Sequence, residues 1–218
     1  MSTVAKKLLL SLAGVTILVA ILFWRQVKRA GTIVTTLSPD PLISASVLPL
    51  PVSPQDPVLG NPGAPLTLVE FIDLTDQKSL ALHTTASEFV RANPREARLI
   101  WKDFPVRSLL SNSHTLPHLA LWCAGEQKKF WPYLEAFLAA PAKNLASLEK
   151  LTNLPGISVP LWKQCLSTPS TEAAINSAQI LAQVLGLKTA PALFINNKQL
   201  NLSEDVDLAS LLKSLVQK

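Results

Sequence analysis

PLTLVEFIDLTDQKS, at residues 65–79, decides the fold of this chain. Its first part, residues 65–72, is apolar and rich in residues that favour β-structure, so it predicts a buried strand. Thr75 or Asp76 then supplies an N-cap for a helix with apolar residues at helical spacing. Residues 97–101, ARLIW, predict a second strand. A strand, a helix and a strand at this spacing form a βαβ unit, whose two strands are parallel.

Beyond this unit, the pattern predicts a helical region, two short strands and a last helix. Apolar residues at helical spacing mark candidate helices at residues 115–140, with a break near Pro132, and at 145–152, 159–166 and 171–185. Strands at 192–195 and 199–202 flank an Asn-Asn-Lys turn, and Ser203 supplies a cap for the helix that follows. The order predicts an α/β protein, βαβ then ββα, with one mixed sheet and an all-helical insertion at about residues 105–186.

The composition excludes two classes of protein and one class of ligand. Apolar residues make up 48% and charged residues 16%, whereas disordered chains combine low hydrophobicity with high charge. Two cysteines are too few for a disulfide-rich miniprotein. The net charge of +5 comes from residues 1–30, because the rest of the chain has equal numbers of basic and acidic residues. Since a nucleic-acid-binding domain needs a basic surface, we expect no nucleic-acid partner.

Residues 8–24, LLLSLAGVTILVAILFW, carry no charge and lie between Lys6–Lys7 and a basic cluster that starts at Arg25. A helix of this length spans about 25 Å, slightly less than the bilayer core of about 30 Å. We expect residues 1–30 to form an uncleaved membrane anchor with basic flanks. A buried helix and a cleaved signal peptide stay open as alternatives, although RQVKRAG after Trp24 offers no small-x-small cleavage site. The flanking charges are balanced, so they do not set the orientation.

Residues 31–57 contain six prolines, which disfavour helix and central strand because proline lacks an amide donor. We expect a semi-rigid linker that holds a globular domain, residues 58–218, away from the membrane. His83, His114 and His118 show no metal-ligand spacing, and the chain has no Gly-rich phosphate loop, so we expect no metal and no cofactor. A Ser-His-Asp triad stays open, although no Gly-x-Ser-x-Gly elbow supports it.

Four segments resemble the DsbA-like branch of the thioredoxin superfamily, and they occur in the order of that family. They are DPVLGNPGAPLTLVEFID (56–73), LIWKDFPV (99–106), LPHLALWCAGEQKKFW (116–131) and LGLKTAPALFINNKQL (185–200). The resemblance implies a thioredoxin-like fold and thiol–disulfide exchange outside the cytoplasm. It also implies a Cys-x-x-Cys pair at the start of the first helix, with a cis-proline loop opposite that pair.

The chain departs from the family at the redox site. The positions of the two cysteines fall on the ends of the stretch Asp76-Gln77-Lys78-Ser79, whereas the cis-proline position falls on Pro191 and is kept. Exchange requires a thiolate that attacks a disulfide sulfur, and Asp76 cannot form a mixed disulfide. Asp76 suits a helix N-terminus instead, both as a hydrogen-bond acceptor and as a negative charge. We therefore expect a pseudoenzyme that has lost dithiol chemistry at this degenerate site.

The two cysteines of the chain, Cys123 and Cys165, lie in the helical insertion, far from each other in the sequence. We expect a structural disulfide between two insertion helices, which is similar to the second cysteine pair of some DsbA-like proteins. Two buried free thiols are the alternative. Because a disulfide needs an oxidising compartment, we expect an extracytoplasmic domain on a single-pass membrane protein whose N-terminus is cytoplasmic.

In catalytic relatives the cis-proline loop holds the substrate near the thiols. The resemblance therefore implies a holding surface at Thr189, Ala190 and Pro191, and we expect it to bind an extended peptide or a partner protein. One alternative is that the loop serves folding alone. The others are a thiol–disulfide oxidoreductase with a non-standard site and a glutathione-using enzyme, since kappa-class transferases bind glutathione through a serine near the position of Ser79. A serine in a first helical turn is more often a local cap.

Two carboxylates flank the end of the first strand. A buried acid in this region assists proton transfer in thioredoxin-like enzymes. Without a thiol partner, we expect Glu70 to be partly buried near Lys78 or Lys102, and Asp73 to lie in a turn.

Overall fold

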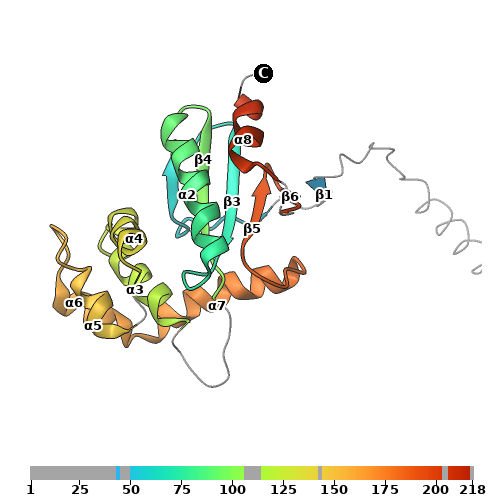
Figure 1. Cartoon of the computed structure of the whole chain (residues 1–218). Coiled ribbons are helices and arrows are strands. Elements are labelled where there is room, and N and C mark those ends of the chain that lie inside the picture. The colour runs from blue at the N-terminus through green and yellow to red at the C-terminus, as the bar shows by residue number, and fades with distance from the viewer. Residues whose placement is uncertain (1–42, 45–49, 106–113, 142–143, 203–205, 217–218) are drawn as a thin grey trace, which may run out of the picture. The chain divides into compact units, whose positions relative to one another are not determined.

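Figure 1 shows the computed structural model of the chain. It describes residues 43–44, 50–105, 114–141, 144–202 and 206–216. All of them belong to one compact unit, which spans residues 40–218. The predicted anchor, residues 1–30, lies outside the described residues. Within the described ranges no helix is both long enough and apolar enough to cross a bilayer.

A six-stranded mixed sheet forms the centre of the domain, in the order β1-β6-β5-β3-β4-β2. The strands are β1 (Ile43–Ser44), β2 (Val58–Gly60), β3 (Leu66–Ile72), β4 (Ala97–Asp103), β5 (Ala192–Ile195) and β6 (Lys198–Leu200). The predicted βαβ unit is confirmed, because β3 and β4 pair in parallel. Strand β5 pairs antiparallel with β3 on its other side. Nearly every residue of β3 and β4 is buried, as expected for central strands covered on both faces.

Helices cover both faces of this sheet (Figure 1). The helices are α2 (Gln77–Ala92), α3 (Leu116–Gly125), α4 (Phe130–Ala139), α5 (Leu145–Lys150), α6 (Val159–Leu166), α7 (Pro169–Val184) and α8 (Leu208–Val216). Helices α2 and α8 pack on one face, against a core that includes Leu68 and Ile72 of β3. Helix α7 packs on the other face, against Val69 and Phe71 of the same strand. The alternation of β3 side chains thus divides the core into two layers.

The helical insertion is present, but its first break is not where the sequence predicts it. The predicted helix at 115–140 is two helices, α3 and α4, and the chain between them turns through Lys128, whose φ is +60°. Pro132 lies in the first turn of α4. Amides of a first helical turn have no acceptor within the helix, so proline costs no hydrogen bond there and causes no break.

A disulfide joins Cys123 of α3 to Cys165 of α6, with their Cα atoms 5.7 Å apart. The predicted disulfide is therefore confirmed. Cys123 is fully buried, whereas Cys165 is half-buried at the edge of the core. The bond closes a loop between residues 42 positions apart. A closed loop of this length stabilises the fold by roughly 4 kcal/mol through the unfolded chain.

Residues 50–57, at the end of the predicted linker, pack on the domain. Leu50 is buried in the layer beneath α7, and its amide donates to Asn197 Oδ1 at 3.1 Å. The ammonium of Lys102 in β4 contacts the carboxylate of Asp56 and donates to the carbonyl of Pro51 at 3.2 Å. The packed part of the chain therefore begins before residue 58. The sequence pattern does not indicate this start, because β1, the strand before residue 58, has only two residues.

Candidate functional site

The start of α2 lies directly after β3, where the resemblance places the redox cysteines. Asp76 is the N-cap of α2, with extended backbone angles of −105° and 124°. Its Oδ2 accepts hydrogen bonds from the amide of Ser79 at 2.7 Å and from the hydroxyl of Ser79 at 2.8 Å. Gln77 and Lys78, between them, are exposed. Of the two capping residues that the sequence allows, the structure thus selects Asp76.

The hydroxyl of Ser79 is already committed to protein partners. It donates to Asp76 and accepts the amide of Asp73 at 3.3 Å, and Ser79 is fully buried. A hydroxyl that binds a glutathione thiolate must instead point its proton at the ligand. The geometry therefore favours local capping by Ser79 over glutathione binding.

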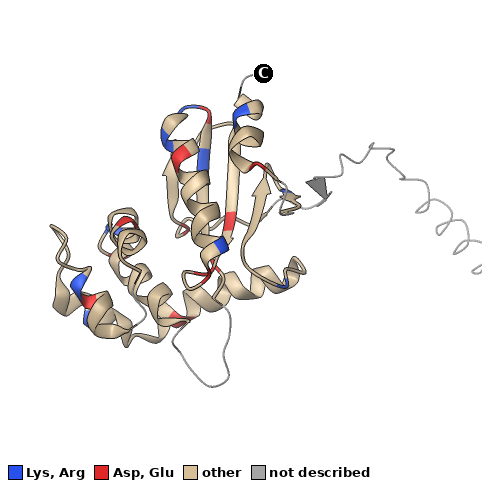
Figure 2. Ribbon diagram, in the orientation of Figure 1, with Lys and Arg blue, Asp and Glu red and all other residues tan. Residues whose placement is uncertain are grey.

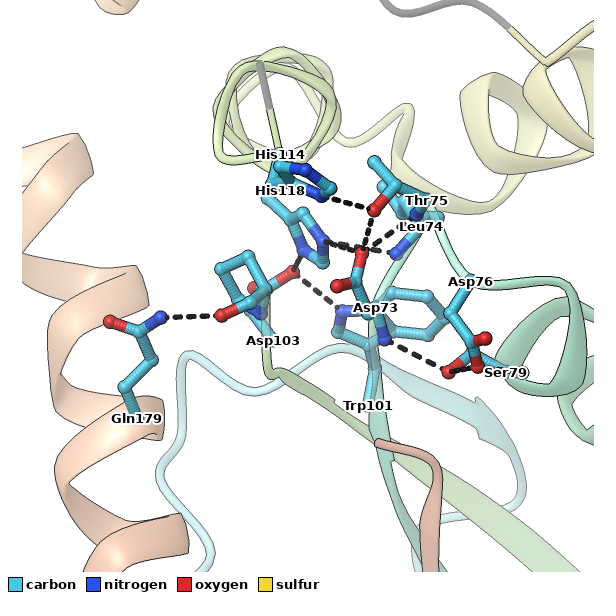
Figure 3. A network of polar contacts seen from close by, with 11 residues as sticks. Asp73, Leu74, Thr75, Asp76, Ser79, Trp101, Asp103, His114, His118 and Gln179 are labelled. Carbon is cyan, nitrogen blue, oxygen red and sulfur yellow. Dashed lines mark hydrogen bonds and ion pairs between the residues drawn. The ribbon is translucent and has the colours of Figure 1, made fainter. Parts of the chain in front are cut away.

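Behind the helix tip, His118 of α3 is buried between two carboxylates (Figure 3). Its Nδ1 lies 2.7 Å from Asp103 Oδ1, at the end of β4, and its Nε2 lies 3.7 Å from Asp73 Oδ1, just after β3. The indole of Trp101 donates to the same oxygen of Asp103 at 2.9 Å. The amide of Leu74 points at His118 Nε2 at 3.0 Å. This network connects the ends of β3 and β4 to the helical insertion.

Two opposing effects act on the pKa of His118. Burial alone would lower it, because burial disfavours the charged imidazolium. The hydrogen bonds and charges of Asp103 and Asp73 outweigh burial, so the pKa is raised above its ordinary value. The Leu74 amide is the contact that favours the neutral ring, since it donates to Nε2.

The raised pKa predicts a pH dependence of stability. A group whose pKa is higher in the folded state contributes its full stabilisation below its unfolded pKa, and the contribution is lost as pH rises through the folded pKa. We expect the unfolding free energy of the full chain, measured in urea, to fall as the pH rises from the ordinary histidine pKa of about 6.5 through the raised pKa of His118. His118→Gln should remove this component, whereas His114→Gln should keep it. An identical slope in His118→Gln would contradict the assignment.

A second histidine reaches the same region from the residues before α3. His114 Nδ1 lies 2.7 Å from Thr75 Oγ1, and that hydroxyl donates to Asp73 Oδ1, also at 2.7 Å. The hydroxyl therefore lies between the acid and the imidazole. In a nucleophilic triad the imidazole lies between the hydroxyl and the acid, so this arrangement does not activate Thr75.

Glu70 of β3 and His83 of α2 form a separate buried pair. His83 Nδ1 lies 2.7 Å from Glu70 Oε1, and the imidazole stacks on Trp131 with ring centroids 6.2 Å apart. The expectation that Glu70 is partly buried near Lys78 or Lys102 is wrong. Glu70 is fully buried against His83. Among the described residues, no cluster of three or more His, Cys, Asp or Glu side chains could hold a metal ion.

A groove runs beside the loop that precedes β5. The peptide bond between Ala190 and Pro191 is cis. The groove has a volume of about 630 Å³ and lies between this loop, α2 and α8. Its lining is mostly small or apolar: Ala81, Leu82, Ala190, Pro191, Leu202, Val206, Leu208 and Ala209, with Lys78, Thr85, Thr189 and Asp207 as polar members. The predicted holding surface thus borders an open, largely apolar groove.

Comparison with known proteins identifies the family. A family model described as "Thioredoxin" matches residues 52–214. The chain belongs to this thioredoxin family. No curated protein matches it.

Solved structures, each less than 25% identical, share the fold of this thioredoxin-family chain. A thioredoxin-like oxidoreductase from Silicibacter pomeroyi DSS-3 is 24% identical, with a TM-score of 0.64 over 76% of this chain and 92% of that one. The catalytic domain of Proteus mirabilis ScsC is 20% identical, with a TM-score of 0.63 over 78% and 93%. The thiol-disulfide exchange protein alpha-DsbA2 from Wolbachia pipientis is 18% identical, with a TM-score of 0.61 over 73% and 87%.

The structure brings the two ends of the Asp76–Ser79 stretch together and shows a network that the sequence did not predict. Asp76 and Ser79 bond to each other, but Asp73, Asp103 and His118 form the larger network behind them. No sequence motif links His118 to Asp103, because α3 and β4 come into contact only in the folded chain. In this thioredoxin-family member the helix tip therefore carries buried polar contacts and no sulfur.

Proposed function

We propose that this chain is a membrane-anchored, extracytoplasmic thioredoxin-family protein that has lost dithiol exchange and holds an extended segment of a partner protein. The observation that carries the proposal is the pairing of two features around α2. The helix tip is closed by the Asp76–Ser79 contacts, while the groove beside the Ala190–Pro191 loop is open.

The positions of the two cysteines support the loss of dithiol exchange. Dithiol exchange needs a thiolate, which a helix N-terminus stabilises. At the N-terminus of α2 the acceptor is the Asp76 carboxylate, which is already bound to Ser79. Both cysteines of the chain are joined in the disulfide between α3 and α6.

The binding of an extended segment is supported by the groove and by its edge. Within the described residues, neither Thr189 nor Ala190 takes part in a backbone hydrogen bond. Unpaired backbone groups beside an apolar surface suit strand addition, in which main-chain bonds give affinity and side-chain pockets give specificity. Leu82, Leu202 and Leu208, which line the groove, would receive apolar side chains.

Two features of the chain support the proposed membrane anchor and extracytoplasmic location. Residues 8–24 would span the membrane, and the proline-rich residues that follow would separate the domain from it. The Cys123–Cys165 disulfide suits an oxidising compartment, which supports an extracytoplasmic domain.

Filling the groove should weaken the capture of an extended chain. Ala190 is half-buried and lines the groove, so Ala190→Leu places a larger side chain in the binding path. The probe is fluorescent, reduced and carboxymethylated α-lactalbumin, which is unfolded and has no free thiol. Its anisotropy should show saturable binding to the full chain and affinity about tenfold weaker for Ala190→Leu, or more.

The matched control is Ala173→Leu, which adds the same side chain at an exposed position of α7. It should bind like the parent, and both variants should keep the melting temperature of the parent. Equal binding by Ala190→Leu and the parent, or no saturable binding by the parent, would argue against the groove as the holding surface.

A further inference from the structure

Trp122 differs from the other tryptophans of the domain. The indoles of Trp101, Trp131 and Trp162 donate to Asp103, to the carbonyl of Val58 and to the carbonyl of Ala120, respectively. Trp122, in α3, is half-buried, and its indole N–H makes no hydrogen bond to any residue that the structure describes. It is therefore a large aromatic surface with a donor available to a ligand.

Two cavities flank Trp122, and both also contact Glu126. The first has a volume of about 470 Å³ and is lined by Trp122, Glu126, Leu161, Gln164, Cys165, Thr168, Ser170 and Thr171. The second has a volume of about 310 Å³ and is lined by Gln55, Pro57, Trp122, Gly125, Glu126, Lys128, Phe130 and Trp131. Neither shares a residue with the groove beside the Ala190–Pro191 loop.

The first cavity has the chemistry of a cation site. Glu126 is the one ionised side chain in its lining, and it is exposed. Among the described residues it takes part in no ion pair. An aromatic face attracts a cation, most strongly when the ring is tryptophan, and a carboxylate forms charge-assisted bonds with guanidinium or ammonium groups. The side chains of Gln164 and Thr168 add further acceptors.

The second cavity is mainly aromatic, with Gln55, Glu126 and Lys128 as its polar members. Three aromatic rings, those of Trp122, Phe130 and Trp131, line it together with Pro57. Since the indole N–H of Trp131 is already bound to Val58, Trp131 offers the cavity an aromatic surface without a free donor. An apolar side chain fits this lining best.

One basic side chain, that of Lys128, lines the second cavity together with Glu126, but it is exposed and forms no ion pair with Glu126. Lys, Arg, Asp and Glu are dispersed over the described helices and strands, without a large region of one sign (Figure 2). The preference for a cation at Glu126 is therefore local. It comes from one carboxylate, with no ion pair to the described residues, beside one indole.

We propose that the paired cavities around Trp122 form a second binding site, for an extended segment of a partner protein that carries a basic and an apolar side chain close together. The Arg or Lys side chain contacts Glu126 and the face of Trp122, and the apolar side chain enters the aromatic cavity. In an extended chain, residues two apart point to the same side, about 7 Å from each other, so two such side chains can enter two neighbouring cavities that share Trp122 and Glu126. This site is independent of the groove beside Ala190.

A labelled pentapeptide, Ser-Arg-Ser-Leu-Ser, tests the site on the full chain by fluorescence anisotropy. We expect saturable binding, weakened about fivefold or more by Glu126→Gln. A peptide with citrulline in place of Arg has no charge and should bind the parent about fivefold more weakly, but Glu126→Gln should weaken it no further. Such non-additivity would show that the guanidinium of the peptide contacts the carboxylate of Glu126.

Two control variants establish that the peptide binds beside Trp122 and not elsewhere on the surface. Glu88→Gln removes another exposed carboxylate, from α2, and should leave the affinity unchanged. Ala190→Leu should also leave it unchanged, because that residue lines the other groove. The proposal is overturned by the absence of saturable binding up to about 1 mM peptide. It is also overturned if Glu126→Gln binds like the parent, or if Ala190→Leu alone removes binding.

Discussion

The double variant Asp76→Cys with Ser79→Cys is expected to reduce insulin with dithiothreitol, at a rate well above that of the parent chain. The two positions lie at the N-cap and in the first turn of α2, where helix amides stabilise a thiolate. The two cysteines would place a thiol nucleophile at the helix tip where the DsbA-like resemblance expects the dithiol. The turbidity of precipitating insulin, measured with the full-length variant, reports the turnover.

The control for this gain is Asp76→Ala with Ser79→Ala, which removes the same cap without adding sulfur. It should remain at background. If the double cysteine variant folds, forms a disulfide and still shows no turnover, the assignment of this helix tip as a degenerate redox site is wrong. If the double alanine variant gains turnover, the chemistry does not depend on sulfur at the tip.

The second large effect is expected at the buried histidine. His118→Leu removes the partner of Asp103 and Asp73, both of which are almost fully buried. Breaking a buried charged network on one side leaves uncompensated carboxylates, which costs about 3–5 kcal/mol. We expect a large fall in the urea midpoint of the full chain, with disulfides intact.

The comparison for His118→Leu is the exposed pair between Arg91 and Glu135. Both side chains are about half exposed, so Arg91→Gln should cost less than about 1 kcal/mol. Similar midpoints for the two variants would show that the network behind the helix tip contributes little to folding. A midpoint for His118→Leu above that of the parent would contradict the account of this network directly.

Much of the core was predictable because its residues form long, periodic segments. The apolar run that became β3 and the capped helix after it need no distant partner to be recognised. The interruption between α3 and α4 was not predictable from Pro132, because a proline in a first turn disrupts nothing. Strands β1 and β2 were missed because two or three residues at a sheet edge carry too little pattern.

The candidate site was predictable only in part. The capping role of Asp76 and the pairing of Cys123 with Cys165 were both expected and are present. The buried contact of His118 with Asp103 joins residues 15 positions apart on different elements. Such contacts depend on how α3 packs against the ends of β3 and β4, which no local spacing determines. Trp122 and Glu126 lie on one helical turn, but the cavities around them are formed mostly by other elements.

The most direct test of the central claim is the dithiol turnover of the unmodified full chain. The account predicts insulin reduction at the background rate of dithiothreitol alone, because the tip of α2 holds a carboxylate and a hydroxyl and the disulfide lies elsewhere. Turnover above background that disappears in Cys123→Ser or Cys165→Ser would contradict it, since the insertion disulfide would then be the redox centre of the protein.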